Sequence, residues 1–250
     1  MTPERILMNR YQPSLARLFL LGVVLAPAGQ AGDLNPAAGL AAIPFEAADP
    51  QLGEEINETC AGCHGEHGQG GKEGEYPRLA GLPAHFIAEQ LLLFRDRTRK
   101  NLAMVESVDH RQMPDEDIAH IAVYLAGIEL PSRLPPADES APGFDSYQRL
   151  LDSKRVVQIP QPEGNPAQGK RIYKRECGSC HGADGMGKED QAVPMIAGQY
   201  TEYLWRQVDK YLRRERIHDK DDPDDELLAA FSREEIRDIL AYVSTLDDGE

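Results

Sequence analysis

The residues with the clearest chemical meaning form a five-residue unit, Cys-x-x-Cys-His, that occurs at positions 60–64 and 177–181. Each unit offers two thiols that could bond the vinyl groups of a haem, and a histidine that could bind the haem iron from one side. The attachment residues would be Cys60, Cys63, Cys177 and Cys180, and the iron ligands would be His64 and His181. The sequence therefore predicts two covalently bound haem c groups.

Two other uses of the four cysteines remain open. An exported protein could pair them in disulfides, and a Cys-x-x-Cys pair could be a redox disulfide or half of a zinc site. Neither use explains why a histidine follows directly both times, and a zinc site would have to join two pairs that are 117 residues apart. Haem attachment is the preferred interpretation.

The elements that must position these units repeat along the chain. A shift of 117 residues places the first unit on the second, and it also superimposes proline, glutamine and aromatic positions. These pairs are Pro77 with Pro194, Gln90 with Gln207, and Phe94 with Tyr211. Sustained spacing of this kind predicts a duplicated domain in which each copy holds one haem.

The periodicity within each copy is helical. Apolar residues three and four apart predict helices at 86–94 and 203–211. A first helix is expected to enter each haem motif, at 54–59 and 167–176, and Asn165 and Pro166 would cap and start the second one. A last helix is expected from Asp115 and from Ser232, each followed by acidic residues suited to a helix N-terminus. Strand signals are nearly absent. We expect an all-α fold of two tandem domains, at 50–128 and 165–247, each wrapped around one haem.

The segment 129–164 between the copies is rich in proline. Proline at that density prevents a continuous helix and favours an extended connector, although a short helix around 147–154 could interrupt it. We expect this linker to let the two domains pack together.

Residues 1–31 have the pattern of an export signal. Arg5, Arg10 and Arg17 precede the apolar run 18–26, and small residues follow it, so cleavage would occur after Ala28 or Ala31. The run is shorter than the roughly 20 residues that cross a bilayer, and the chain would be held at a membrane only if the signal were retained. The mature protein is expected in the periplasm of a Gram-negative bacterium.

The formal net charge of −15 limits the partners. Nucleic-acid binding is disfavoured, because recognition of phosphates needs a basic surface. A protein partner with a basic docking face is favoured, because complementary charges speed encounter.

The chain resembles a known family, the class I cytochromes c, and more narrowly the dihaem periplasmic cytochromes similar to cytochrome c4. The resemblance rests on the two Cys-x-x-Cys-His units, the stretch 76–81, the residues from Gln90 to Phe94 and the helix start at 115–118, with their counterparts in the second half. In that family, a proline after the haem motif supplies the carbonyl that holds the proximal histidine. The resemblance implies this role for Pro77 and Pro194.

The family also implies a methionine as the sixth iron ligand, shortly before the last helix. In the first half, Met104 is expected in a loop ten residues after Phe94, which suits that role. Met113, directly before Pro114, is better explained as packing.

The second half has no methionine at the corresponding place, which falls near Asp221. Met186 is too close to His181 in sequence, and Met195 is expected on the proximal side. His218 is the remaining donor, and histidine ligation would lower the potential of that haem. The alternative is an open second haem.

We expect a single-electron carrier between redox proteins, with a His/Met first haem and a bis-His or open second haem. The partner could be a dehydrogenase or a terminal oxidase. Two alternatives stay open: an enzyme that binds a small molecule at an open second haem, and the cytochrome subunit of a larger periplasmic dehydrogenase. No catalytic residue is assigned.

Overall fold

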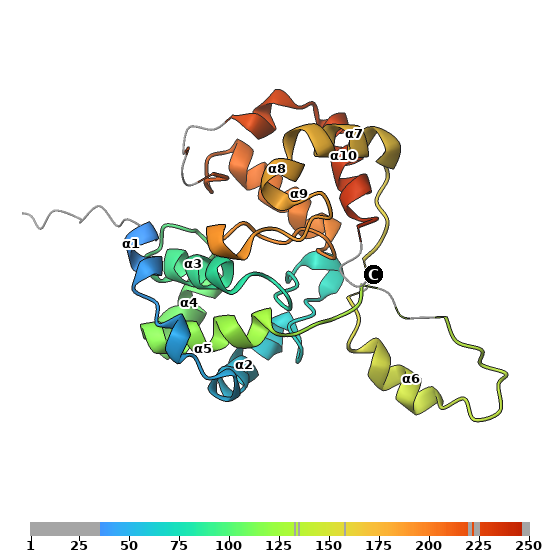
Figure 1. The fold of residues 1–250 in the computed structure, drawn as a ribbon, viewed down its shortest axis with the longest axis horizontal. Helices are drawn as coiled ribbons and strands as arrows, with labels where there is room; N and C mark the ends of the chain where they lie inside the picture. Colours follow the sequence, from blue (N-terminus) through green and yellow to red (C-terminus); the bar gives the residue numbers. More distant parts are fainter. Residues whose placement is uncertain are drawn as a thin grey trace, which may run out of the picture. The chain divides into compact units, whose positions relative to one another are not determined.

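A computed structural model describes residues 36–132, 134, 136–157, 159–219, 222 and 226–246 (Figure 1). The expected export signal at 1–31 lies outside these residues, as does Asp221. The described elements are helices, and the pairing within the described ranges amounts to two isolated bridges, Gly71 with Tyr76 and Lys188 with Val193. The described helices include none that is long and apolar enough to span a membrane.

The first half is built on a crossing of two helices that bury their apolar faces against each other. Helix α2 (Pro50–His64) begins with the Asp49 side chain as its N-cap, and it packs on α5 (Asp115–Ala126), which has three acidic residues in its first turn. The other helices of this half are α1 (Pro36–Ala41), α3 (Ala84–Arg95) and α4 (Leu102–Arg111), with short 3-10 turns at Phe45–Ala47 and Lys72–Gly74.

The second half repeats this plan. Helix α7 (Pro166–Glu176) is capped by Asn165 and packs on α10 (Arg233–Val243), where Ser232 and Glu235 form a capping box. The remaining elements are α8 (Gly178–His181), α9 (Thr201–Leu212) and 3-10 turns at Glu189–Gln191 and Leu227–Ala230. The helices expected from periodicity are therefore confirmed in both halves.

Two glycines allow the helix crossings. A Cβ on Gly53 of α2 would lie 2.3 Å from the carbonyl oxygen of His120 in α5. A Cβ on Gly169 of α7 would lie 1.8 Å from the carbonyl oxygen of Asp238 in α10. Each crossing needs a residue without a side chain, because the two backbones touch there.

The two attachment helices differ by one residue. Gly53 stands seven residues before Cys60, whereas Gly169 stands eight residues before Cys177. One extra residue would rotate the second motif by about 100° relative to the crossing face if the helix were continuous. Instead α7 ends at Glu176 and α8 starts at Gly178, so the break at Cys177 absorbs the insertion.

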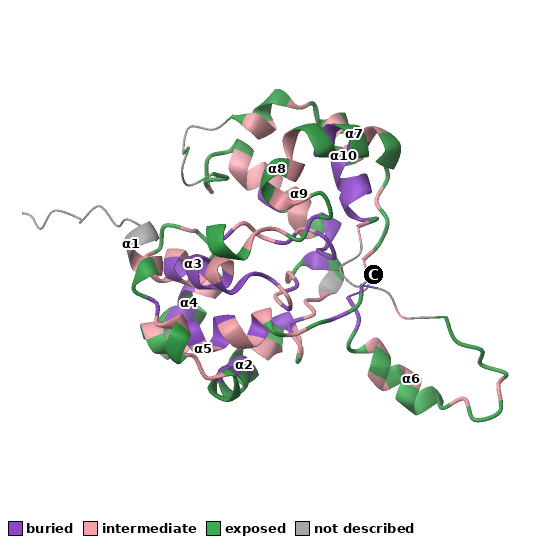
Figure 2. Cartoon of the chain, in the orientation of Figure 1, coloured by how far each residue is buried: buried purple, intermediate pink, exposed green. Residues whose placement is uncertain are grey.

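The halves share a hydrophobic core. Met195 and Ala197 of the second half belong to the cluster formed by Ile118, Ile121 and Leu125 of the first half. Figure 2 shows how buried residues concentrate along α3 and α5. The two halves therefore pack against each other, as the sequence allowed.

The linker contains the expected short helix, α6 (Ser146–Ser153), which begins after the N-cap Asp145. Tyr147 and Leu150 of α6 are exposed, and α6 contacts no other described helix. In Figure 2 its surface is mostly exposed.

Candidate haem sites

His64 is the last residue of α2 and is held by one backbone group. It is buried, and its Nδ1 lies 3.0 Å from the carbonyl oxygen of Pro77. A carbonyl only accepts, so Nδ1 carries the proton and Nε2 keeps its lone pair for a metal ion. Burial lowers the pKa of His64, partly offset by the bond to Pro77, which favours the neutral imidazole that binds iron.

His181 repeats this geometry in the second half. Its Nδ1 lies 3.0 Å from the carbonyl oxygen of Pro194. Burial lowers the pKa of His181, the bond to Pro194 opposes this, and nearby His218 lowers it further. Pro77 and Pro194 thus occupy equivalent positions behind the two histidines, where a carbonyl fixes the ring orientation.

The four cysteines form no disulfide and lie in two separate segments, at the end of α2 and at the start of α8. Cys63 and Cys180 are exposed, while Cys60 and Cys177 are partly buried. Burial raises the pKa of the Cys177 thiol to about 11, with smaller contributions from Glu176 and Cys180. The backbone after His181 is fixed as well, because the Tyr173 hydroxyl donates to the Gly182 carbonyl over 2.7 Å.

The exposed ring of His218 lies near the ring of His181. The centroids of the two imidazole rings are 6.3 Å apart, with 37° between the ring planes. In an imidazole ring the nitrogen lies about 1.15 Å from the centroid, given C–N bonds of about 1.35 Å. Two such nitrogens bound to one metal ion at about 2.0 Å would place the centroids about 6.3 Å apart. The spacing therefore fits one iron between His181 and His218.

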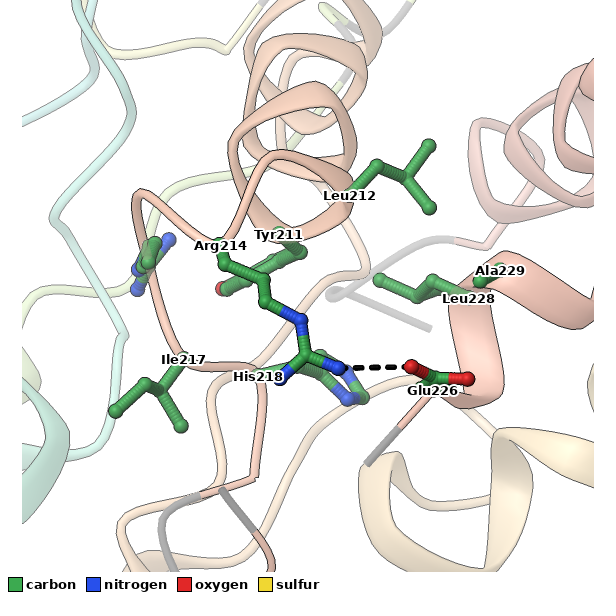
Figure 3. Close-up of a pocket in the computed structure, with 9 residues that line it drawn as sticks. Tyr211, Leu212, Arg214, Ile217, His218, Glu226, Leu228 and Ala229 are labelled. Atoms are coloured by element: carbon green, nitrogen blue, oxygen red, sulfur yellow. Dashed lines mark hydrogen bonds and ion pairs between the residues drawn. The ribbon is translucent and has the colours of Figure 1, made fainter. Parts of the chain in front are cut away.

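A cavity of about 270 Å³ borders His218. Figure 3 shows it between the end of α9 and the turn at Leu227–Ala230, with Tyr211, Leu212 and Leu228 among its lining residues. The Tyr211 ring meets His218 edge-on at 5.1 Å, and an ion pair between Arg214 and Glu226 lies beside the cavity. Apolar side chains share the cavity wall with the charged groups of Arg214, Arg216 and Glu226.

Met104 does not lie in the expected loop. It stands in the first turn of α4, where Asn101 caps the helix and the Met104 N–H faces the Asn101 Oδ1 at 3.5 Å. The apolar pattern here is weak, which favours a loop, but the Asn101 side chain caps the first turn and a helix forms. Met104 is partly buried against the first half's core, and its assignment as a ligand stays a prediction. Met113 is buried in that core, in line with packing.

A polar cluster between the halves was not anticipated from sequence. The Arg99 guanidinium donates to the side-chain oxygens of Gln90, Tyr203 and Gln207, at 2.8, 3.1 and 3.2 Å. Arg216 donates to Gln207 at 2.8 Å and to Gln90 at 3.0 Å. Both arginines therefore share the same two glutamines across the interface.

The charge in this cluster is poorly compensated. The partners of the two arginines given above are neutral oxygens, and burial together with Arg216 lowers the pKa of Arg99. Two partly buried guanidinium groups side by side attract carboxylates, which haem carries, and Arg216 also lines the cavity beside His218. The repeat offered a signal, because a shift of 117 places Arg99 on Arg216 just as it places Gln90 on Gln207.

The sequence also did not predict the role of Arg78. It is 1 % exposed, and its guanidinium donates to the carbonyls of Ala80, Leu130 and Gly198. The Gln199 amide exchanges two 3.0 Å bonds with the Arg78 backbone. Because Arg78 follows Pro77, the second half and the linker contribute to positioning the loop that holds His64.

Comparison with known proteins identifies the family. The family model for cytochrome c matches residues 51–129 and again residues 166–247. The chain belongs to the cytochrome c family. Covalent haem c is the cofactor of such domains, and this cytochrome has two of them in tandem.

Relatives match most of the chain. The cytochrome is 27% identical to a thiosulfate dehydrogenase electron acceptor of Stutzerimonas stutzeri, over 76% of this chain and 80% of that one. It is 25% identical to cytochrome c4 of Pseudomonas aeruginosa, over 83% and 94%. The reduced cytochrome c4 structure from Pseudomonas stutzeri has the same fold, with a TM-score of 0.60, 21% identity and coverage of 80% and 100%.

Proposed function

We propose that this cytochrome is a periplasmic dihaem carrier that passes single electrons between redox proteins. The support is the duplicated Cys-x-x-Cys-His unit, each with a histidine oriented by a proline carbonyl. The relatives named as an electron acceptor and as cytochrome c4 point the same way. The localisation rests on the signal-like sequence at 1–31 and on the export that haem c attachment requires.

The residues divide the work of holding two haem c groups. Cys60 and Cys63, and Cys177 and Cys180, form the thioether bonds. His64 and His181 bind iron through Nε2, with Pro77 and Pro194 fixing their rings. Met104 completes the first site and His218 the second. When bound, haem iron supplies reversible one-electron oxidation and reduction.

The unequal sixth ligands set unequal potentials. A thioether favours the ferrous state and raises the potential, whereas a second imidazole lowers it. The first site is therefore the high-potential one. Its attachment helix presents Glu54, Glu55 and Glu58 to solvent, which suits a partner with a basic docking face.

The spacing of 6.3 Å between His181 and His218 carries the assignment of the second site. The test is a near-infrared and visible spectrum of the oxidised protein, followed by carbon monoxide addition to the reduced protein. We expect one sulfur-to-iron band at about 700 nm, with half the intensity that two Met-ligated haems would give. We also expect that the reduced protein does not bind carbon monoxide.

The variant His218→Ala sharpens this test. It should open the second haem, so that one of two haems binds carbon monoxide, while His67→Ala leaves both closed as the matched control. High-spin features and fast carbon monoxide binding in the unaltered protein would reject His218 ligation. They would favour instead an enzyme with an open second haem.

A second candidate is the electron-accepting partner of a periplasmic dehydrogenase. Similarity to a thiosulfate dehydrogenase electron acceptor over most of both chains favours it. Co-purification of a dehydrogenase with the native protein would support this role, and isolation of the cytochrome alone would favour the free carrier.

A further inference from the structure

The two haem-attachment helices carry opposite charge at equivalent positions. Aligning the crossing glycines, Gly53 and Gly169, sets three glutamates of α2 against three cations of α7. The pairs are Glu54 with Lys170, Glu55 with Arg171, and Glu58 with Lys174. All six are exposed, so the reversal affects the surface and leaves the buried faces alike.

The cations of α7 form a basic stripe, defined as Lys170, Arg171, Lys174 and Arg175. Helix α2 has three acidic residues and no lysine or arginine, whereas α7 has these four cations and one glutamate, Glu176. Such a stripe is unexpected on a chain with a net charge of −15.

The middle of the basic stripe is the part open to a partner. Arg175 contacts Glu176. Lys170 lies over the Tyr242 ring at 5.9 Å. Arg171, by contrast, contacts the neutral amide of Gln168, and Lys174 is exposed on the same face.

The basic stripe ends beside the second attachment motif. Lys174 stands three residues before Cys177, which is about 4.5 Å along a helix axis. Cys180 and Met186 are exposed in the segment that follows. A protein bound on this stripe would therefore lie close to the second haem.

We propose that the basic stripe docks an acidic redox protein. The second domain would then bind an acidic partner, whereas the first domain binds a basic one. This rests on the proposed carrier function and deepens it. Complementary local charge steers encounter and fixes orientation, and its effect fades with salt. The position beside the haem motif favours a redox protein over a lipid surface, because bound lipid would cover the site of electron exchange.

The test measures rates with two probes of opposite charge. The acidic probe is flavodoxin hydroquinone, and the basic probe is a reduced basic cytochrome c. Each gives one electron to the oxidised protein, so that one ferric haem becomes ferrous. Stopped-flow absorption yields the second-order rate constant. At about 10 mM ionic strength, where the Debye length is about 30 Å, Arg171→Glu with Lys174→Glu should slow the flavodoxin reaction about tenfold. The reaction with basic cytochrome c should not slow.

Two matched controls separate local from global charge. Glu55→Lys with Glu58→Lys, at the equivalent positions of α2, should slow only the basic cytochrome c. Lys154→Glu with Arg155→Glu, exposed in the linker, changes the net charge by the same amount as the stripe variant and should slow flavodoxin less than about twofold. Equal slowing by the stripe and linker variants would overturn the proposal.

Two further results would also overturn it. One is binding to phosphatidylglycerol vesicles that the stripe variant loses, with an unchanged flavodoxin rate. The other is self-association in sedimentation that the stripe and α2 variants both abolish, which would make a second copy the occupant. If the unaltered protein contained no haem, or exchanged electrons with neither probe, the carrier function itself would be rejected.

Discussion

Replacing Gly53 by alanine tests whether the crossing of α2 and α5 holds the first domain together. The new Cβ would lie 2.3 Å from the His120 carbonyl oxygen and 2.5 Å from the Tyr124 Cβ. Non-bonded heavy atoms in ordinary contact are at least about 3.4 Å apart, so the helices must separate by about 1 Å. Such overpacking costs about 1–3 kcal/mol. The separation also strains the 2.8 Å bond from the Asp49 N–H to the His120 Nδ1, which contributes about 1 kcal/mol.

The helix propensity of alanine offsets about 1 kcal/mol of that loss. The net destabilisation of Gly53→Ala is therefore about 1–3 kcal/mol, which lowers the melting temperature by about 2–12 °C for a cooperative unit of this size. The assay is far-ultraviolet circular dichroism of the holoprotein during heating, with haem content checked by its absorption.

The control lies in the same helix. A Cβ on Gly62 would meet no atom within 4 Å, and the second motif already has Ser179 at the equivalent place. Gly62→Ala should leave the melting temperature unchanged or raise it. If Gly53→Ala were as stable as Gly62→Ala, the helices would not be held in contact at Gly53.

Three other variants probe features that the repeat distributes unequally. Gly169→Ala should destabilise more than Gly53→Ala in the same melting assay, because its Cβ would lie only 1.8 Å from the Asp238 carbonyl; the reverse order would contradict the crossing geometry. Arg78→Met should lower the free energy of unfolding in urea by about 3 kcal/mol, because three buried carbonyls lose their donor, and Arg78→Lys should restore only part of it. Ser232→Ala should cost about 1 kcal/mol at neutral pH. The backbone N–H and the hydroxyl of Ser232 both donate to the Glu235 carboxylate and lower its pKa, so the stabilisation from these bonds is present above the ordinary glutamate pKa and is lost as pH falls through the lowered value. Of these two bonds, Ser232→Ala removes only the one from the hydroxyl, so the unfolding free energies of the variant and the unaltered protein should draw closer between pH 7 and pH 3 without meeting. A constant difference would rule out the link to Glu235.

Local signals were enough to predict the attachment helix, the middle helix and the last helix of each half. Period-3.6 apolar patterns located α3, α5, α9 and α10, and Ser232 marked the start of α10. Helix α4 was missed because Leu102, its first residue, is 73 % exposed and the apolar pattern is weak. The Asn101 cap was the available start signal.

The candidate site also has features that the sequence predicts and features that it does not. The orientation of His64 and His181 depends on residues 13 positions further along the chain, Pro77 and Pro194, so a family motif could indicate it. The bonds that join Arg99 to Gln207, and Arg216 to Gln90, depend on how the halves dock. Docking is a tertiary property that periodicity within one half does not encode.

The break at Cys177 bears on how haem is attached. In the first half the motif ends an unbroken helix from Pro50, whereas in the second half a one-residue break at Cys177 separates α7 from α8. A maturation enzyme that recognised a folded helix would meet two different shapes in one substrate. Both motifs become alike only in the unfolded chain, where the five residues are read without their surroundings. If haem were bonded before the chain folds, both attachments would start from the same five residues, and each half would then pack its helices around a cofactor already in place.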